Sequence, residues 1–187
     1  MPTLVATEKF YTLEDSISLP ADGKRYELWE GKLVEIAAAR EDHSRIGSRL
    51  IGLLFYFVAI QNDLGDVYGP DSTFDILGHG LSPDVAFVAK GRLFESQCGM
   101  AVIPLVPDLA VEVKSAGDTF PEVKAKVKKY QQAGVRLIWM IVPGNKTVQV
   151  YRSGDDKPQK LGVEQELSGE EVISGFTVKV SKLFEHS

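Results

Sequence analysis

The stretch that decides the fold is Leu109-Ala-Val-Glu-Val-Lys114, an apolar run interrupted by one carboxylate and closed by one lysine. Such a run is typical of a short buried β-strand, whose side chains point alternately to the two faces of a sheet. Glu112 and Lys114 therefore emerge together on one face, and Leu109, Val111 and Val113 occupy the other. Because burying charged groups is costly, we expect the two to be compensated by each other, by a metal ion or by solvent in a cleft.

The residues that follow predict a helix and then a second apolar strand. Thr119-Phe-Pro-Glu122 has the pattern of a capping box with proline in the first turn, and Gly134 is a helix stop signal. The next apolar run is Leu137–Val142. A strand, a helix and a strand within residues 109–142 predict a right-handed crossover that joins two parallel neighbours.

Apolar segments before residue 109 and after residue 142 predict the remaining strands of a mixed sheet. Strands are predicted at residues 84–88 and 147–151, and residues 25–36 predict a β-hairpin that turns at Glu30-Gly31. Apolar residues recur at helical spacing from Ser44 to near Asn62, with Asp42 or Ser44 as the expected N-cap. The most apolar part of this helix, residues 50–60, is expected to be buried, since it is too short to cross a membrane.

The composition bounds the class of protein. The chain has 187 residues, of which 44% are hydrophobic and 25% are charged, so we expect a single domain over 1–187 with its core at about 25–184. The net charge of −5 argues against a protein that wraps nucleic acid by bulk charge. One cysteine, Cys98, and an N-terminus without the pattern of a signal peptide favour a cytoplasmic location and no membrane association.

Asp84 and Glu112 are candidate metal ligands. Asp84 opens one strand, and the 27 residues between it and Glu112 allow the chain to return along a neighbouring strand. Two such carboxylates suit Mg²⁺ or Mn²⁺, and the main-chain carbonyl of Val113 could add a ligand. Lys114 would then orient a water molecule and stabilise developing negative charge. The alternative interpretation of Glu112 and Lys114 is a salt bridge at the end of a surface strand.

These segments together resemble the PD-(D/E)XK nuclease superfamily and, more closely, its Uma-type branch of restriction-endonuclease-like proteins. The resemblance runs from about residue 26 to 184, and no single piece of it is specific, but the ordered set is. The matching pieces are Tyr26-Glu-Leu-Trp-Glu-Gly-Lys-Leu-Val-Glu35, Asp42-His43, Asp71-Ser-Thr-Phe74, Leu81-Ser-Pro-Asp-Val-Ala-Phe-Val88, Pro107-Asp-Leu-Ala-Val-Glu-Val-Lys-Ser115, Lys126-Val-Lys-Lys-Tyr130, Ala133-Gly-Val135, Thr147-Val-Gln-Val-Tyr-Arg152 and Leu167-Ser-Gly-Glu-Glu-Val172.

The resemblance implies an α/β fold with a restriction-endonuclease-like core, a mixed sheet flanked by helices, and magnesium-dependent cleavage of DNA. Asp84 and Glu112 would be the metal ligands. Many relatives take their lysine from the following helix, here Lys126, but Lys114 stands in the usual place and is ranked first, with Lys126 in a supporting or phosphate-contacting role. The superfamily's additional acid has three weak candidates, which are Glu27, Glu35 and Glu41.

Other polar residues have both a functional and a structural interpretation. His43 could contact phosphate or relay a proton, or it could cap a helix. Lys124 and Lys128 lie in a segment, Glu112–Arg136, with six basic and three acidic residues, and would face the cleft if they contact DNA, although a solvated helix face looks the same. Tyr130 and Trp139 are expected to be core residues.

Three functions remain open from the sequence. The leading one is a metal-dependent endonuclease, which requires Asp84, Glu112 and Lys114 to converge on one open cleft, with DNA as its partner. A homodimer is expected, since many nucleases pair across a two-fold axis to cut both strands. The alternative is a non-catalytic DNA-binding or assembly module that retains the fold, in which the same side chains could be blocked or divergent. The third, hydrolysis of a small nucleotide, needs a pocket too narrow for duplex DNA.

Overall fold

A computed structural model describes residues 9–19, 24–36, 40–115, 117–155 and 157–186. Residues 1–8, which carry part of the expectation about a signal peptide, lie outside this range. Within it, no helix is both long and apolar enough to span a bilayer. The helices are α1 (Leu13–Ile17), α2 (Glu41–Phe55), a π-helical continuation (Tyr56–Gln61), α3 (Phe120–Ala133) and α4 (Val180–Phe184), with short 3₁₀ turns at Glu95–Gln97 and Pro143–Asn145.

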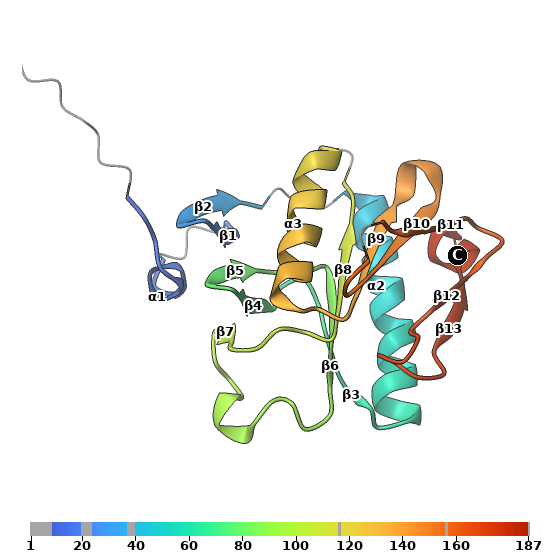
Figure 1. Cartoon of the computed structure of the whole chain (residues 1–187), viewed down its shortest axis with the longest axis horizontal. Coiled ribbons are helices and arrows are strands. Elements are labelled where there is room, and N and C mark those ends of the chain that lie inside the picture. The colour runs from blue at the N-terminus through green and yellow to red at the C-terminus, as the bar shows by residue number, and fades with distance from the viewer. Residues whose placement is uncertain (1–8, 20–23, 37–39, 116, 156, 187) are drawn as a thin grey trace, which may run out of the picture.

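A six-stranded mixed sheet forms the centre of the protein (Figure 1). Its strand order is β11 (Gln159–Leu161), β10 (Thr147–Arg152), β9 (Leu137–Val142), β8 (Leu109–Val113), β6 (Val85–Ala89) and β3 (Gly65–Tyr68). Strands β8 and β9 are parallel and joined by α3, and their other neighbours are antiparallel. The predicted crossover and the mixed sheet are thus confirmed.

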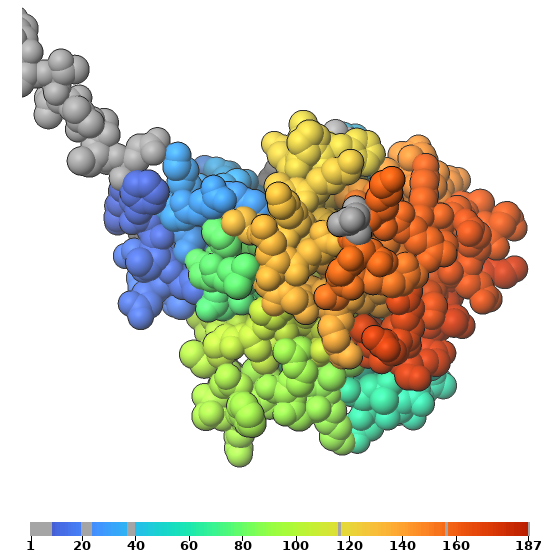
Figure 2. All heavy atoms as spheres, in the orientation of Figure 1, coloured from blue at the N-terminus to red at the C-terminus, as the bar shows by residue number. Residues whose placement is uncertain are grey.

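The two faces of this sheet bury two separate cores, as the alternation in β8 predicts. Leu109, Val111 and Val113 face one core, to which α2 contributes Ile46, Leu50 and Leu54. Ala110 faces the other core, together with Val123, Val127 and Tyr130 of α3. In Figure 1 the two helices accordingly lie on opposite sides of the sheet, and in Figure 2 the outer surface of α3 lies between the N-terminal strands and the C-terminal segments. Both helices are therefore fixed against β8, the strand that carries Glu112.

A second, five-stranded sheet contains the predicted hairpin. Its order is β2 (Lys32–Glu35), β1 (Tyr26–Trp29), β5 (His79–Leu81), β4 (Thr73–Ile76) and β7 (Val102–Ile103), and a third sheet pairs β12 (Glu166–Ser168) with β13 (Thr177–Lys179). The hairpin turns at Glu30 and Gly31, whose φ angles of 49° and 75° are both positive, as a tight two-residue turn requires. A Cβ on Gly31 would also lie 2.7 Å from the ring of Phe10.

Helix α2 begins earlier than the sequence predicts, but it continues through the π-helical turn to Gln61 and so ends where predicted, near Asn62. It begins at Glu41, and Arg40 at the N-cap position makes no side-chain cap. Asp42 lies inside the first turn and not at the N-cap, but its Oδ1 does accept a free amide of that turn, from His43, at 2.9 Å. The acids Glu41 and Asp42 both lie in the first turn, where they complement the helix dipole. Residues 50–60 are only partly buried: Leu50, Leu54 and Val58 are buried, whereas Tyr56 and Ile60 are exposed. One side of an amphipathic helix faces solvent, which an all-apolar sequence conceals.

Candidate active site

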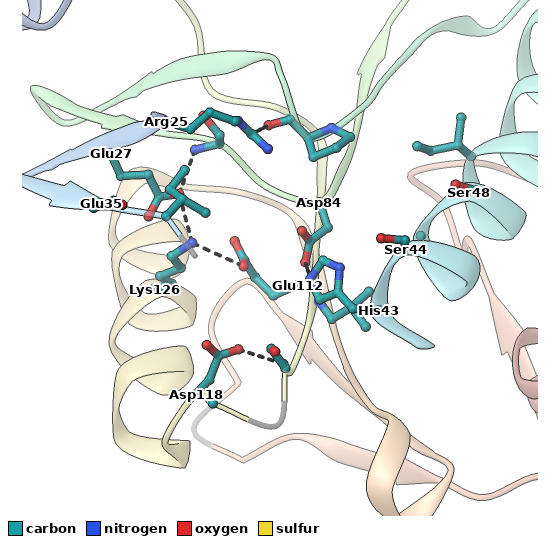
Figure 3. Close-up of a pocket in the computed structure, with 18 of the residues that line it drawn as sticks. Arg25, Glu27, Glu35, His43, Ser44, Ser48, Asp84, Glu112, Asp118 and Lys126 are labelled. Carbon is teal, nitrogen blue, oxygen red and sulfur yellow. Dashed lines mark hydrogen bonds and ion pairs between the residues drawn. The ribbon is translucent and has the colours of Figure 1, made fainter. Parts of the chain in front are cut away.

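Asp84 and Glu112 face each other across two neighbouring strands. Strands β6 and β8 pair antiparallel with Val85 opposite Val111, so the same register places Asp84, just before β6, opposite Glu112. Glu112 and Ala110 alternate to the α3 side of the sheet, where the carboxylate reaches the end of the apolar core. Figure 3 shows the two carboxylates next to each other, between His43 and Lys126.

Asp84 is fixed by two donors. The Val113 amide donates to Asp84 Oδ2 at 2.7 Å, and His43 Nε2 lies 3.1 Å from the same oxygen. His43 comes from the first turn of α2 and is largely buried, as is Asp84. The hydrogen bond to Asp84 raises the pKa of His43 above 6.5, although burial opposes the change. His43 is therefore biased towards its cationic form and orients Asp84.

Glu112 is held by two residues of α3. Tyr130 donates its hydroxyl to Glu112 Oε1 at 2.7 Å, and Lys126 Nζ lies 3.4 Å from Oε2. Burial raises the pKa of Glu112 to about 8; attraction to Lys126 opposes this rise, while the negative charges of Asp84 and Glu27 add to it. The positive charge of Lys126 is thus too little to offset the burial of Glu112 and the two neighbouring carboxylates, so the anionic form of Glu112 is disfavoured.

Lys126 lies between two carboxylates. Its ammonium is 2.8 Å from Glu27 Oε1 and 3.4 Å from Glu112 Oε2. Burial alone would lower the pKa of Lys126, but Glu112 and Glu27 outweigh it and raise the pKa, so Lys126 is a permanent cation. Glu27 is itself fixed, because its Oε1 also accepts the Ser82 amide at 3.0 Å. The hairpin strand β1 therefore supports the lysine of the site.

These residues open into a cleft of about 620 Å³. The hairpin and α2 form its walls, and the ends of β6 and β8 form its floor (Figure 3). Lys126, Glu27, Asp84, Glu112 and His43 all line it, as does the main chain of Val113. The cleft therefore brings two carboxylates from the sheet together with one lysine from α3 and one histidine from α2.

Lys114, ranked first from the sequence, does not line this cleft. Its ammonium donates to the main-chain oxygens of Ser115 at 3.0 Å and Asp118 at 2.6 Å, and it lies over the ring of Phe120. Strand β8 ends at Val113, and although the Lys114 amide still donates to the Ile141 carbonyl at 2.8 Å, the Lys114 side chain turns to the loop before α3 and not into the cleft. The structure thus places Lys126, and not Lys114, beside Glu112 in the cleft, while Lys114 contacts the loop before α3.

Three further candidates also lie away from the cleft. Lys124 and Lys128 are exposed and do not line it, because each is two residues, about 200° of helix rotation, from the inward-facing Lys126. Glu41 does not line it either: its side chain is 72% exposed and bonds to Arg45. Glu35 does line the cleft but pairs with Lys24 in an exposed ion pair. Of the three candidate acids, Glu27 is the one in contact with Lys126.

Tyr130 and Lys126 both contact Glu112, although the sequence predicts a core role for Tyr130 and only a supporting role for Lys126. Tyr130 packs in the core as expected, but its hydroxyl also reaches Glu112. A signal for Lys126 was present in α3, whose buried residues Val123, Val127 and Tyr130 recur at helical spacing. Lys126 falls within this stripe, and a lysine on the apolar face of a helix requires a buried partner. No comparable signal marked Glu27 in the half-buried strand β1.

The donor set fits a magnesium ion that keeps several water ligands. Among the described ranges, no three His, Cys, Asp or Glu side chains are grouped so that they could hold a metal ion by themselves. Mg²⁺, however, is commonly bound by one or two carboxylates together with water and substrate phosphate. Asp84 and Glu112 provide two carboxylates in an open cleft, and the shortage of positive charge at Glu112 is what a cation would relieve.

Comparisons with known proteins agree with this fold. The family model Uma2, described as "Putative restriction endonuclease", matches residues 8–181. The fold is similar to that of a solved protein from Anabaena variabilis ATCC 29413, described as "a putative nuclease belonging to DUF820". That similarity has a TM-score of 0.80 and 21% sequence identity, and it covers 92% of this chain and 97% of the other. No curated protein matches the chain. The resemblance and the fold class inferred from the sequence are thereby confirmed.

Proposed function

The chain belongs to the Uma2 family of restriction-endonuclease-like proteins, and from this premise we propose that it is a metal-dependent endonuclease that hydrolyses DNA phosphodiester bonds. One observation carries the proposal. Asp84, Glu112 and Lys126 reach one open cleft from three different parts of the fold, and the side chains of Asp84 and Glu112 are only 15% and 9% exposed. A buried carboxyl group with a raised pKa that lines a cleft, as Glu112 does, is typical of functional sites.

Asp84 and Glu112 would hold Mg²⁺ or Mn²⁺, with the main-chain carbonyl of Val113 as a further ligand. When bound, such a cation lowers the pKa of a water ligand and polarises the phosphate. His43 and the Val113 amide fix Asp84 during the reaction, since both already bond to its Oδ2. The chain's own contribution is thus two carboxylates that are oriented before substrate binds.

Lys126 takes the role of the catalytic lysine in this proposal. Its ammonium lies beside Glu112 and is held by Glu27, so it is a fixed positive charge at the floor of the cleft. It would orient the attacking water and stabilise the negative charge that develops on the phosphate oxygens. The water would give up a proton to bulk solvent as its oxygen bonds to phosphorus, and the bond between phosphorus and the leaving sugar oxygen would break, with that oxygen taking a proton from solvent. Lys114 stabilises the loop before α3 and has no part in the chemistry.

The substrate and the assembly are parts of the same proposal. DNA is the expected partner, and a homodimer would allow both strands of a duplex to be cut. Lys124 and Lys128, on the exposed side of α3, would add to affinity only if DNA extends around that helix. Sedimentation of the purified protein with and without DNA measures the oligomeric state, and a monomer under both conditions would contradict the dimer.

Cleavage of supercoiled plasmid tests the activity. The purified protein is incubated with Mg²⁺, with Mn²⁺ or with chelator, and nicked and linear products are quantified on a gel. Asp84→Asn, Glu112→Gln and Lys126→Met remove the three site groups with little change in shape. Lys160→Met is the matched control, because it removes an exposed lysine that neither lines the cleft nor lies on α3.

We expect metal-dependent nicking that falls at least about 100-fold in each of the three site variants and stays near the wild-type rate in the control. If the folded wild type cuts nothing with either metal but still retards DNA in a gel, the non-catalytic binding module is the better description. If it hydrolyses a small phosphodiester but leaves plasmid intact, the substrate is a nucleotide.

A further inference from the structure

Tyr130 belongs to the core by its ring and to the site by its hydroxyl. Its side chain is 0% exposed and packs in the cluster between α3 and the sheet, with Val127, Ile138 and Met140. The hydroxyl donates to Glu112 Oε1 at 2.7 Å. The reaction proposed above assigns this contact no role, yet it is the shortest hydrogen bond that the structure gives to the Glu112 carboxylate.

The two oxygens of Glu112 have different surroundings. Oε1 accepts the Tyr130 hydroxyl inside the core, whereas Oε2 is the oxygen near Lys126, whose side chain lines the cleft. Lys126 and Tyr130 are four residues apart in α3 and therefore reach the carboxylate from the same face of one helix. The buried ring cannot turn without opening a gap in a close-packed core, so its hydroxyl is a fixed donor.

We propose that Tyr130 is a positioning residue that holds one oxygen of Glu112 and thereby presents the other to a divalent cation in the cleft. This inference rests on the proposed function, because it deepens the role of Glu112 as a cation ligand. Hydrogen bonds to ligating carboxylates fix their orientation and are a general source of metal affinity. The hydroxyl touches neither substrate nor cation and acts only through Glu112.

Mn²⁺ binding to the purified protein tests the role without depending on activity. Tyr130→Phe removes the hydroxyl and keeps the ring, and free Mn²⁺ is measured by electron paramagnetic resonance during a titration. Tyr151→Phe is the matched control, because Tyr151 is also a buried member of the same core and donates its hydroxyl to Gln149 Oε1 at 2.9 Å. We expect Tyr130→Phe to weaken Mn²⁺ binding about 10- to 100-fold and Tyr151→Phe to leave it within roughly twofold of wild type.

A measurement on the wild-type protein covers the case in which Tyr130→Phe does not fold. Tyrosines are labelled with ¹³C at Cζ, and Mg²⁺ is added to the folded protein. The Cζ resonance of Tyr130 should shift as the cation binds, since its hydroxyl bonds to a ligand, while that of Tyr151 should not. A Tyr130 resonance that stays in place while Mg²⁺ binding saturates would overturn the proposal.

The outcomes separate this inference from the proposed nuclease. Mn²⁺ affinity in Tyr130→Phe within twofold of wild type overturns the positioning role, as does a wild type that binds no Mn²⁺. If the wild type binds Mn²⁺, loses that affinity on Tyr130→Phe and yet nicks no plasmid, the positioning role stands and the proposed endonuclease activity fails.

Discussion

The metal-free protein is expected to lose stability as pH rises from about 5 to about 8, because of the proton on Glu112. Burial raises the pKa of this carboxyl from 4.5 to about 8. Between these values the folded protein holds a proton that the unfolded chain has released, so the unfolding free energy falls with pH. One such group changes stability by about 1.4 kcal/mol per pH unit, or by roughly 5 kcal/mol over the window as an upper bound.

Burial sets the sign of this effect, and the charged groups around Glu112 change its size. Lys126 opposes the rise in its pKa, and Asp84 and Glu27 add to it. His43 contributes a loss in the same direction, since its hydrogen bond to Asp84 raises its pKa above 6.5 and the resulting stability disappears as pH passes that higher value.

Urea unfolding in chelator at pH 5.5, 6.5, 7.5 and 8.5 measures the effect. Glu112→Gln is neutral throughout, so it should lose most of the slope and keep only the part due to His43. Added Mg²⁺ should stabilise the wild type more at pH 8.5 than at pH 5.5, because a ligating carboxyl must release its proton. A wild-type stability that is flat or rises over this range, or a slope that Glu112→Gln leaves unchanged, would refute the reasoning.

Three further predictions concern single residues. Lys126→Met should reduce plasmid nicking at least about 100-fold, whereas Lys114→Met, which removes only a brace of the loop, should change the rate less than about threefold in the same gel assay. Asp108→Asn should lower the unfolding free energy by about 2 kcal/mol at pH 7, since the buried Asp108 carboxylate accepts from Arg92, Arg136 and the Ala89 amide. These donors hold the pKa of Asp108 below 3.8 despite burial, so the difference from wild type should shrink in urea melts as pH falls through that lower pKa. Thr119→Ala should cost about 1 kcal/mol by the same measurement, because Thr119 and Glu122 cap α3 reciprocally.

The central fold was readable from the sequence because local patterns and chain connectivity agreed. The alternation in Leu109–Val113 predicts two buried faces, and the strand–helix–strand order leaves a parallel pair as the natural solution. The distance along the chain from Asp84 to Glu112 then suffices to bring the two carboxylates onto neighbouring strands. The hairpin at residues 25–36 is also predictable from the sequence, since a glycine between two short strands indicates a hairpin turn.

The second sheet and its part in the site could not be predicted in this way. Glu27 reaches Lys126 only because the hairpin packs beside α3, a contact between residues 99 positions apart. Period-two alternation in a half-buried strand says which residues share a face, but not what lies opposite that face. For that reason the sequence offers Glu27, Glu35 and Glu41 as candidate acids but does not single out Glu27 as the one that contacts Lys126.

The exchange between Lys114 and Lys126 has a physical cause. Lys114 lies one residue past the end of β8. Its amide still donates to the Ile141 carbonyl of β9, but its side chain satisfies the carbonyls of the turn that leads to α3. Lys126 instead lies in the buried stripe of a capped, 14-residue helix, and its position is fixed by packing on both sides. Preorganised charge is worth most where it cannot rearrange. A lysine on a packed helix therefore meets the requirement of the site better than one at the start of a loop, even though the sequence motif favours the latter.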